Sequence, residues 1–139
     1  MRQPAAWARS RFAAAPVARL ATVSAAGEPH LVPVVFAVVG STIVTAVDHK
    51  PKSTTRLRRL RNIAETGRVA LLVDEYAADW SRLWWARADG TARVVDAGEV
   101  EAATITALTD RYRQYADQPP AGPYLLVDVQ RWSGWSATS

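Results

Sequence analysis

Asp48–Arg68 reads DHKPKSTTRLRRLRNIAETGR, and the fold is best predicted outward from this stretch. It lies between two apolar segments typical of β-strands, Ser41–Val47 and Val69–Val73. Leucine and isoleucine recur at helical spacing in its second half, which predicts a helix over Thr54–Thr66 that ends at Gly67. The order is therefore strand, basic turn, helix and strand.

The start of this stretch is strongly basic. Lys50 and Lys52 bracket Pro51, and no acidic residue stands between Lys50 and Asn62. Like charges in this segment therefore lack the i, i+4 partners of an ordinary solvated helix. The N–H groups of a first helical turn also point at any docked anion, and Ser53–Thr55 can cap the helix or bind phosphate oxygens. We expect anion binding here, with a solvated helix face as the alternative.

The segments before the basic turn predict a hairpin. Val17–Ser24 and His30–Val39 read as two strands joined by a turn, and the second is almost continuously apolar. Pro33 lies within the second strand and has no backbone N–H to donate to a neighbouring strand, which predicts a sheet edge, a bulge or a gap at this point. A gap there leaves backbone groups free to bind a ligand.

The remaining segments complete a small mixed domain. We expect a helix over Gln3–Ala14, strands over Arg68–Asp74, Arg82–Asp96 and Tyr124–Arg131, and an amphipathic helix over Gly98–Ala116. The strand over Arg82–Asp96 is predicted to bend or bulge near Ala88–Gly90. Six or seven strands with three helices, joined mostly as hairpins, predict one domain over residues 1–139. Its expected architecture is a small antiparallel barrel with added helices.

Composition narrows the class of protein. The 139 residues are 49% hydrophobic, enough for a core, yet no apolar run approaches the roughly 18–20 residues of a membrane span. Arg9 and Arg11 interrupt the N-terminal segment, so we expect no signal peptide. The absence of cysteine excludes disulfides and thiolate chemistry and fits a cytoplasmic location. The net charge of +4 suggests an anionic partner.

The distribution of tryptophan is the second feature, after the basic turn, that suggests a binding site. Three of the six tryptophans, Trp80, Trp84 and Trp85, gather at the start of one predicted strand, and Trp132 and Trp135 stand near the C-terminus. Adjacent residues of a strand face opposite sides, so one of Trp84 and Trp85 enters the core. The other is expected to cover a ligand or a partner chain.

No catalytic constellation stands out. His30 and His49 are far apart in sequence, the serines lack a nucleophile-elbow context, and nothing has metal-ligand spacing. We therefore assign no catalytic residue and expect no metal. A flat heteroaromatic ligand with a phosphate would account for both the basic turn and the tryptophans. The tryptophan rings would cover the flat part of the ligand, and the lysines would hold its phosphate.

These segments resemble the pyridoxamine 5′-phosphate oxidase-like superfamily of flavin-binding split β-barrels. The similarity is carried by VARLATVSAAGEPHLVPVVF, DHKPKSTTRLRRLRNIAETGRVALLVD, DWSRLWWARADGTARV and RWSGWSA, which together span nearly the whole chain. The KPK turn with LWWARADG is more similar to the actinobacterial branch that binds the deazaflavin coenzyme F420. The resemblance implies a split β-barrel of the FMN-binding type, with six or seven antiparallel strands and flanking helices.

The resemblance also implies a cofactor site. Residues flanking the ring system would be Leu31, Val32, Pro33, Val34, Ala46 and Val47. The phosphate would be held at Lys50, Pro51 and Lys52, with Arg56 or Arg59 as helpers. The expected assembly is a homodimer with two cofactors at the subunit interface, where Trp85 and above all Trp135 would reach the cofactor.

The implied chemistry is hydride transfer from reduced coenzyme F420 to an electron-poor small molecule such as a quinone, a tetrapyrrole or an unsaturated ring compound. The cofactor performs the difficult step, which agrees with the lack of a catalytic triad. Three alternatives stay open: an FMN-dependent enzyme of the same superfamily, a non-catalytic F420 carrier or sensor, and a nucleic-acid-binding barrel that uses the arginine-rich helix. Nucleic acid is disfavoured because no aromatic residues are interleaved with the basic segment.

Overall fold

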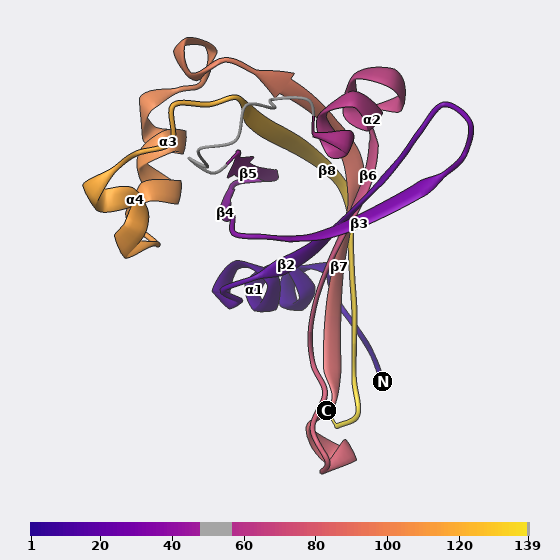
Figure 1. The fold of residues 1–139 in the computed structure, drawn as a ribbon. Helices are drawn as coiled ribbons and strands as arrows, with labels where there is room; N and C mark the ends of the chain where they lie inside the picture. Colours follow the sequence, from indigo (N-terminus) through magenta and orange to yellow (C-terminus); the bar gives the residue numbers. More distant parts are fainter. Residues whose placement is uncertain (48–56, 139) are drawn as a thin grey trace.

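The computed structural model describes residues 1–47 and 57–138, and its strands form one antiparallel sheet (Figure 1). The eight strands in the described residues are β1 (Arg2–Gln3), β2 (Ala18–Val23), β3 (Pro29–Val34), β4 (Ala37–Val39), β5 (Thr42–Ala46), β6 (Arg68–Glu75), β7 (Trp84–Val95) and β8 (Tyr124–Ser136). The helices are α1 (Ala5–Ala14), α2 (Arg58–Thr66), α3 (Ala102–Thr109) and α4 (Arg113–Asp117), with short 3₁₀ turns η1 (Trp80–Arg82) and η2 (Ala97–Glu99).

The order of the strands makes the sheet a split barrel. The order is β3-β2-β6-β7-β8-β5-β4, and β1 adds to β8. The strands β3 and β4 follow each other in the chain, with only Val35 and Phe36 between them, yet they form opposite edges of the sheet. Such a short connection brings the two edges together without joining them. The predicted antiparallel split barrel with flanking helices is confirmed, with eight strands in the described residues instead of the six or seven predicted.

One hydrophobic core fills the barrel and is closed by α1. Leu20, Ile43 and Leu71 point inward from three strands, as the alternation of side chains in a strand requires. Phe12 of α1 is fully buried, with its ring centroid 5.5 Å from that of Trp132. Helix α1 therefore packs against β7 and β8.

A second core lies on the opposite side of β5. Val44 and Tyr124 face outward from β5 and β8, and they pack with Leu108 of α3 and Tyr115 of α4. In Figure 1 these two helices, in orange, lie beside β4 and β5. Both faces of β5 are therefore covered, which agrees with the burial of Ile43, Val44, Thr45 and Ala46.

Two predicted elements are wrong in their extent. The single strand over His30–Val39 is two strands, because the chain leaves the sheet at Val35 and Phe36. The predicted edge at Pro33 is confirmed, since β3 pairs with β2 alone. The last strand continues to Ser136 instead of ending at Arg131, so both C-terminal tryptophans belong to the sheet.

The predicted helix over Gly98–Ala116 is also wrong, because it is broken into η2, α3 and α4. Tyr112 is extended, with φ −129° and ψ 123°. Its hydroxyl and the guanidinium of Arg111 bind backbone groups of the barrel, which pulls the chain out of the helical path. Tertiary hydrogen bonds here override a continuous amphipathic pattern.

Helix α2 begins later than predicted. Leu57 is extended and precedes the first residue of α2, Arg58, while Thr54, the predicted start, lies outside the described residues. Within the helix Ala64 is exposed, whereas Asn62 is buried beside Ile63. The end of the helix is as predicted, since Gly67 has φ 68° and its N–H donates to Ile63 O over 2.8 Å.

The long ladder between β7 and β8 confirms two expectations. Its register shifts between Asp89 and Gly90, where a bulge was predicted. Trp84 and Trp85 face opposite sides: Trp84 packs edge to face with Trp7 of α1, while Trp85 pairs with Trp135 on the other face of the sheet. No helix in the described part of the chain is long and apolar enough to cross a membrane.

Candidate functional site

A cavity of about 230 Å³ lies where the barrel is split. We call it the split cavity, and its lining residues are Val17, Pro33, Val34, Val35, Thr45, Ala46 and Arg59. It is bounded by the end of β3 on one side, the end of β5 on another and α2 on a third. Four of the predicted cofactor residues, Pro33, Val34, Ala46 and Arg59, are thus brought together.

The wall of the split cavity is set by the gap between β3 and β4. The chain leaves the sheet after Val34, so the carbonyl of Val35 has no ladder partner and instead accepts a 2.7 Å hydrogen bond from Thr45 Oγ1. Thr45 is 2% exposed, and Ala46 beside it is 8% exposed. Because the Thr45 hydroxyl is buried and already hydrogen-bonded, and Ala46 presents a methyl group, this wall of the split cavity is apolar.

The other predicted residues of β3 lie elsewhere. Leu31 is 65% exposed on the outer face, opposite Ala21, and Val32 packs into the barrel core opposite Leu20. Neither lines the split cavity. Val47 follows the cavity wall, and its N–H donates to Pro123 O over 3.1 Å.

Four predicted residues, Lys50, Pro51, Lys52 and Arg56, lie outside the described residues. The segment that carries them joins Val47 to Leu57. Ala46 precedes this segment and Arg59 follows it, and both line the split cavity.

Trp85 and Trp135 are brought together, but not with the split cavity. They are paired across β7 and β8, and the guanidinium carbon of Arg87 lies 5.3 Å from the Trp85 ring centroid. Ala46 pairs with Tyr124 at the opposite end of β8. Within one chain the two predicted halves of the site therefore lie at opposite ends of one long ladder (Figure 1).

The arginines of α2 line two different hollows. Arg59 lines the split cavity, whereas Arg58 and Arg61 line a hollow beside the turn between β2 and β3. Arg58 lies 3.7 Å from Glu28 of that turn, so its carboxylate partner comes from a residue distant in sequence. At least one arginine of the basic segment therefore has an acidic partner, which the sequence around it does not indicate.

Sequence reasoning missed the buried polar pair behind α2. Asn62 is 1% exposed, and its Nδ2 donates to Thr22 Oγ1 over 3.0 Å. This bond ties α2 to β2 and fixes the side of the helix that carries Arg59. The sequence carried a signal for this, since Asn62 is the one uncharged polar residue between Arg58 and Glu65.

Shifted pKa values lie away from the split cavity. Hydrogen bonds from the hydroxyl and the N–H of Ser81 lower the pKa of Asp79, and burial raises the pKa of Tyr124. Neither residue lines the split cavity. Among the described residues no group of histidine, cysteine or acidic side chains could hold a metal ion. The described part of the site is therefore suited to binding and orienting a ligand.

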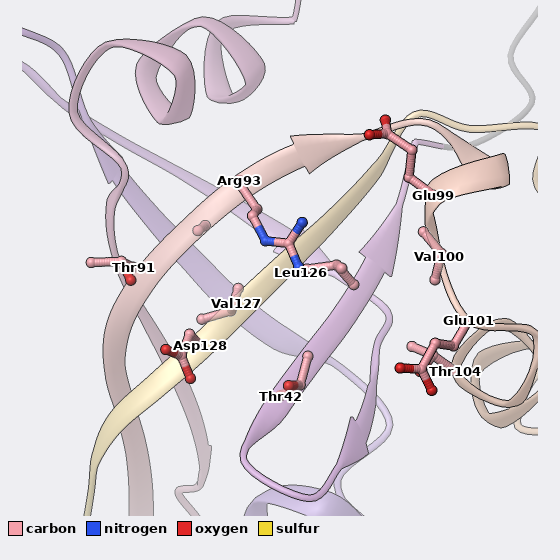
Figure 2. Close-up of a pocket in the computed structure, with 11 residues that line it drawn as sticks. Thr42, Thr91, Arg93, Glu99, Val100, Glu101, Thr104, Leu126, Val127 and Asp128 are labelled. Atoms are coloured by element: carbon pink, nitrogen blue, oxygen red, sulfur yellow. The ribbon is translucent and has the colours of Figure 1, made fainter.

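A larger groove of about 560 Å³ lies on the outer face of β5, β7 and β8 (Figure 2). We call it the charged groove. Arg93 extends from β7 across β8, while Asp128 lies on β8, and Glu99 and Glu101 lie on the opposite rim (Figure 2). None of the predicted cofactor residues lines it.

The amino-acid sequence matches one family of known proteins. The sequence model of the family described as pyridoxamine 5′-phosphate oxidase matches residues 6–136. No curated protein matches the chain in sequence.

Several solved structures share the fold. An FAD-binding protein from Mesorhizobium loti has a TM-score of 0.74 at 17% identity, covering 96% of this chain and 93% of that one. The haem storage protein HutZ from Vibrio cholerae has a TM-score of 0.68 at 19% identity, covering 89% of each chain. The FAD-binding protein from Mycobacterium smegmatis has a TM-score of 0.65 at 17% identity, covering 97% of each chain. At sequence identities this low, the structural similarity establishes a common fold and nothing more.

Proposed function

Because this chain belongs to the pyridoxamine 5′-phosphate oxidase family, we propose that it is an oxidoreductase that binds a phosphate-bearing flavin or deazaflavin in the split cavity. The observation that carries the proposal is the composition of that cavity. Its strand side is uncharged, with Pro33, Val34 and Ala46, and its helix side carries Arg59. An apolar wall beside a cation fits a flat ring that bears an anionic tail.

The phosphate is proposed to lie toward the basic turn. Lys50 and Lys52, with Pro51 between them, stand in the segment that leaves the cavity wall after Ala46, and Arg56 and Arg59 follow. A phosphate there would gain charge-assisted hydrogen bonds, which are stronger than neutral ones. FAD binding by two proteins of the same fold supports a flavin-type ligand.

We further propose that the cofactor is coenzyme F420, with FMN as the alternative. When bound and reduced, the deazaflavin supplies a hydride to an electron-poor small molecule. The residues of this chain would position the ring, hold its phosphate and exclude water from its apolar face. The resemblance of the KPK turn and of LWWARADG to the deazaflavin-binding branch favours coenzyme F420.

The active form is proposed to be a homodimer. The split cavity has a volume of about 230 Å³, below the roughly 300–1,000 Å³ of typical ligand sites. One protomer would therefore enclose only part of the cofactor. The outer face with Trp85 and Trp135 also carries exposed apolar side chains, Leu31 at 65% and Leu72 at 37%. A second copy could cover this face and bring its tryptophans to the cofactor.

A non-catalytic F420 carrier or sensor is the second candidate. It is favoured by one observation, that none of the described residues lining the split cavity is an acid or a histidine able to exchange a proton. A nucleic-acid-binding barrel is less well supported, because the arginines of α2 are divided between two hollows. Steeply salt-dependent binding to DNA or RNA would favour it.

The deciding experiment is a side-by-side titration with coenzyme F420 and with FMN, followed by ligand and tryptophan fluorescence. We expect micromolar or tighter binding of coenzyme F420 and weaker binding of FMN. Preference for FMN would assign the FMN-dependent alternative, and binding of neither would contradict the proposed function. Turnover of reduced coenzyme F420 with a panel of quinones then separates the reductase from the carrier.

A further inference from the structure

A hollow of about 280 Å³ lies between α2 and the turn that joins β2 and β3, and we call it the turn hollow. The residues of α2 that line it are Arg58, Arg61, Asn62 and Glu65. Their spacing of three and four residues places them on one face of the helix. None of them lines the split cavity, so the turn hollow is separate from the proposed cofactor site.

The turn hollow is bridged at both ends. At one end the N–H of Ala25 donates to Glu65 Oε1 over 3.0 Å, and at the other end Arg58 lies 3.7 Å from Glu28. These two contacts hold the turn against the helix. Arg61 and Asn62 lie between them along α2. They are therefore the lining residues that a ligand in the middle of the hollow would meet.

Asn62 has a buried acceptor without a donor. The residue is 1% exposed, and its Nδ2 already donates to Thr22 Oγ1 over 3.0 Å. Its Oδ1 has no hydrogen-bond partner among the described residues. A buried acceptor that lacks a donor costs free energy, so a ligand that brings an N–H or O–H to this atom would be stabilised.

Arg61 supplies a cation next to this acceptor. It is exposed on α2 and has no acidic partner in the part of the chain that the structure describes. A guanidinium presents its N–H groups in one plane and can bind a carboxylate with two of them. Arg61 and Asn62 together therefore match a ligand in which an anionic group stands beside a hydrogen-bond donor.

The charges around Arg61 and Asn62 indicate which donor fits. Glu28 and Glu65 add two carboxylates to the lining, which balance the guanidinium groups of Arg58 and Arg61. A phosphate with two negative charges would be repelled by both carboxylates. A positively charged donor would instead be attracted by them. The lining therefore favours a small zwitterion over an anion.

We propose that the turn hollow binds a free α-amino acid. The carboxylate of the amino acid binds Arg61, and its ammonium group donates to Asn62 Oδ1 beside the carboxylate of Glu65. In an α-amino acid the two groups are attached to the same carbon, which suits binding partners on consecutive residues. This second ligand site does not depend on the proposed oxidoreductase function, because the turn hollow and the split cavity share no lining residue.

The test is a titration of the full chain with glycine, followed by the amide signals of Ala25 and Glu65 in two-dimensional NMR spectra. Three analogues each remove one feature of glycine. Glycine betaine keeps both charges but has no N–H, N-acetylglycine lacks the positive charge, and glycinamide lacks the carboxylate.

A pair of variants tests the place of binding. Arg61→Gln removes the cation from an exposed position on α2, so the fold should be retained. Arg68→Gln is the matched control, since Arg68 is exposed on β6 and does not line the turn hollow.

We expect glycine to shift these signals saturably in the wild type and in Arg68→Gln alike. Arg61→Gln and each of the three analogues should weaken binding about tenfold or more. Spectra that do not change with glycine, or equal affinities of Arg61→Gln and Arg68→Gln, would overturn the site. Equal affinity for glycine betaine would overturn the role of Asn62 Oδ1, and equal affinity for N-acetylglycine or glycinamide would overturn the ligand class.

Titrations with coenzyme F420 and FMN distinguish this site from the proposed cofactor site. Glycine should leave the affinity for either cofactor unchanged, and its shifts should persist when a cofactor is bound. Loss of the glycine shifts on cofactor binding would overturn the assignment to the turn hollow. If neither cofactor binds, the proposed function fails, whereas the glycine titration still decides whether the turn hollow binds an amino acid.

Discussion

The hydroxyl of Tyr112 binds both backbone polar groups of Phe36: it accepts from the Phe36 N–H over 3.1 Å and lies 2.9 Å from the Phe36 carbonyl oxygen. A side chain at the junction of α3 and α4 thus satisfies the backbone exactly at the gap between β3 and β4, where no neighbouring strand can do so. The gap that makes room for a ligand is stabilised from outside the barrel.

Removal of this hydroxyl should destabilise the fold. Tyr112→Phe leaves the N–H of Phe36 without its acceptor, and we expect a loss of about 1–3 kcal/mol in the free energy of unfolding, measured with urea. Tyr76→Phe is the matched control, since Tyr76 is 70% exposed and should change by less than about 0.5 kcal/mol. Equal effects of the two substitutions would contradict the role assigned to Tyr112.

The proposed phosphate site predicts a specific loss of affinity. Lys52→Ala should weaken the binding of coenzyme F420 or FMN by about 1.5–3 kcal/mol, the range for hydrogen bonds to charged groups. Arg68→Ala, an exposed arginine on β6, should have little effect. Fluorescence titration measures both. If Lys52→Ala weakens nucleic acid as much as it weakens the cofactor, the lysine is not part of a dedicated phosphate site.

The proposed dimer predicts complementation between two defective chains. Lys52→Ala and Trp135→Ala should each bind cofactor poorly, because one residue is contributed from each subunit. After unfolding and refolding as an equal mixture, half of the dimers are mixed, and each mixed dimer has one intact site. Binding should therefore recover at about a quarter of all sites. No recovery, or a monomer by light scattering, would exclude a site shared in this way.

Two glycine substitutions should act in opposite directions. At Gly90, beside the bulge in β7, an added Cβ would lie 2.1 Å from the backbone oxygen of Asp128, so the ladder must shift. We expect Gly90→Ala to cost about 1–3 kcal/mol or more. At Gly98 nothing lies within 4 Å of an added Cβ, and Gly98→Ala should be neutral or stabilise by up to about 1 kcal/mol. Thermal unfolding distinguishes the two signs.

Alkaline pH should destabilise the protein through Tyr124. Burial raises the pKa of Tyr124 above its ordinary value of 10.0, so the folded chain holds this proton more tightly than the unfolded chain. Its stabilisation is fully present below about pH 10 and is lost as pH rises through the folded pKa.

The check on this prediction is Tyr124→Phe, measured by urea unfolding between pH 9 and pH 11. The variant loses the 2.8 Å bond to Pro120 O, about 0.5–1.5 kcal/mol, and its stability should fall less steeply with pH. A steeper slope in Tyr124→Phe would reverse the predicted sign.

Local patterns in the sequence were sufficient for the elements whose ends are marked by local chemistry. Gly67 ended α2 as predicted, because a glycine can adopt the left-handed conformation of the helix end. Pro33 indicated a sheet edge because it cannot donate to a ladder. The opposite faces of Trp84 and Trp85 followed from the two-residue period of a strand.

Elements whose ends depend on distant partners were not predictable in this way. The break at Tyr112 arises from its bonds to Pro16 and Phe36, which no local pattern records. The same holds for the site: Pro33, Val34, Ala46 and Arg59 meet at the split cavity, but the roles of Val17 and Val35 appear only when the edges of the barrel are closed. The burial of Asn62 depends likewise on Thr22, forty residues earlier.

The place of β8 in the sheet has a consequence for synthesis of the chain. This strand pairs with β1, β5 and β7, and it is the last of the described strands to be made. Until Tyr124–Ser136 is available, β5 can pair only with β4, and β7 lacks one of its neighbours. The barrel therefore cannot close on a ribosome-bound chain that ends before β8, and apolar strand edges stay exposed until then, which is when chaperone binding or aggregation would compete with folding.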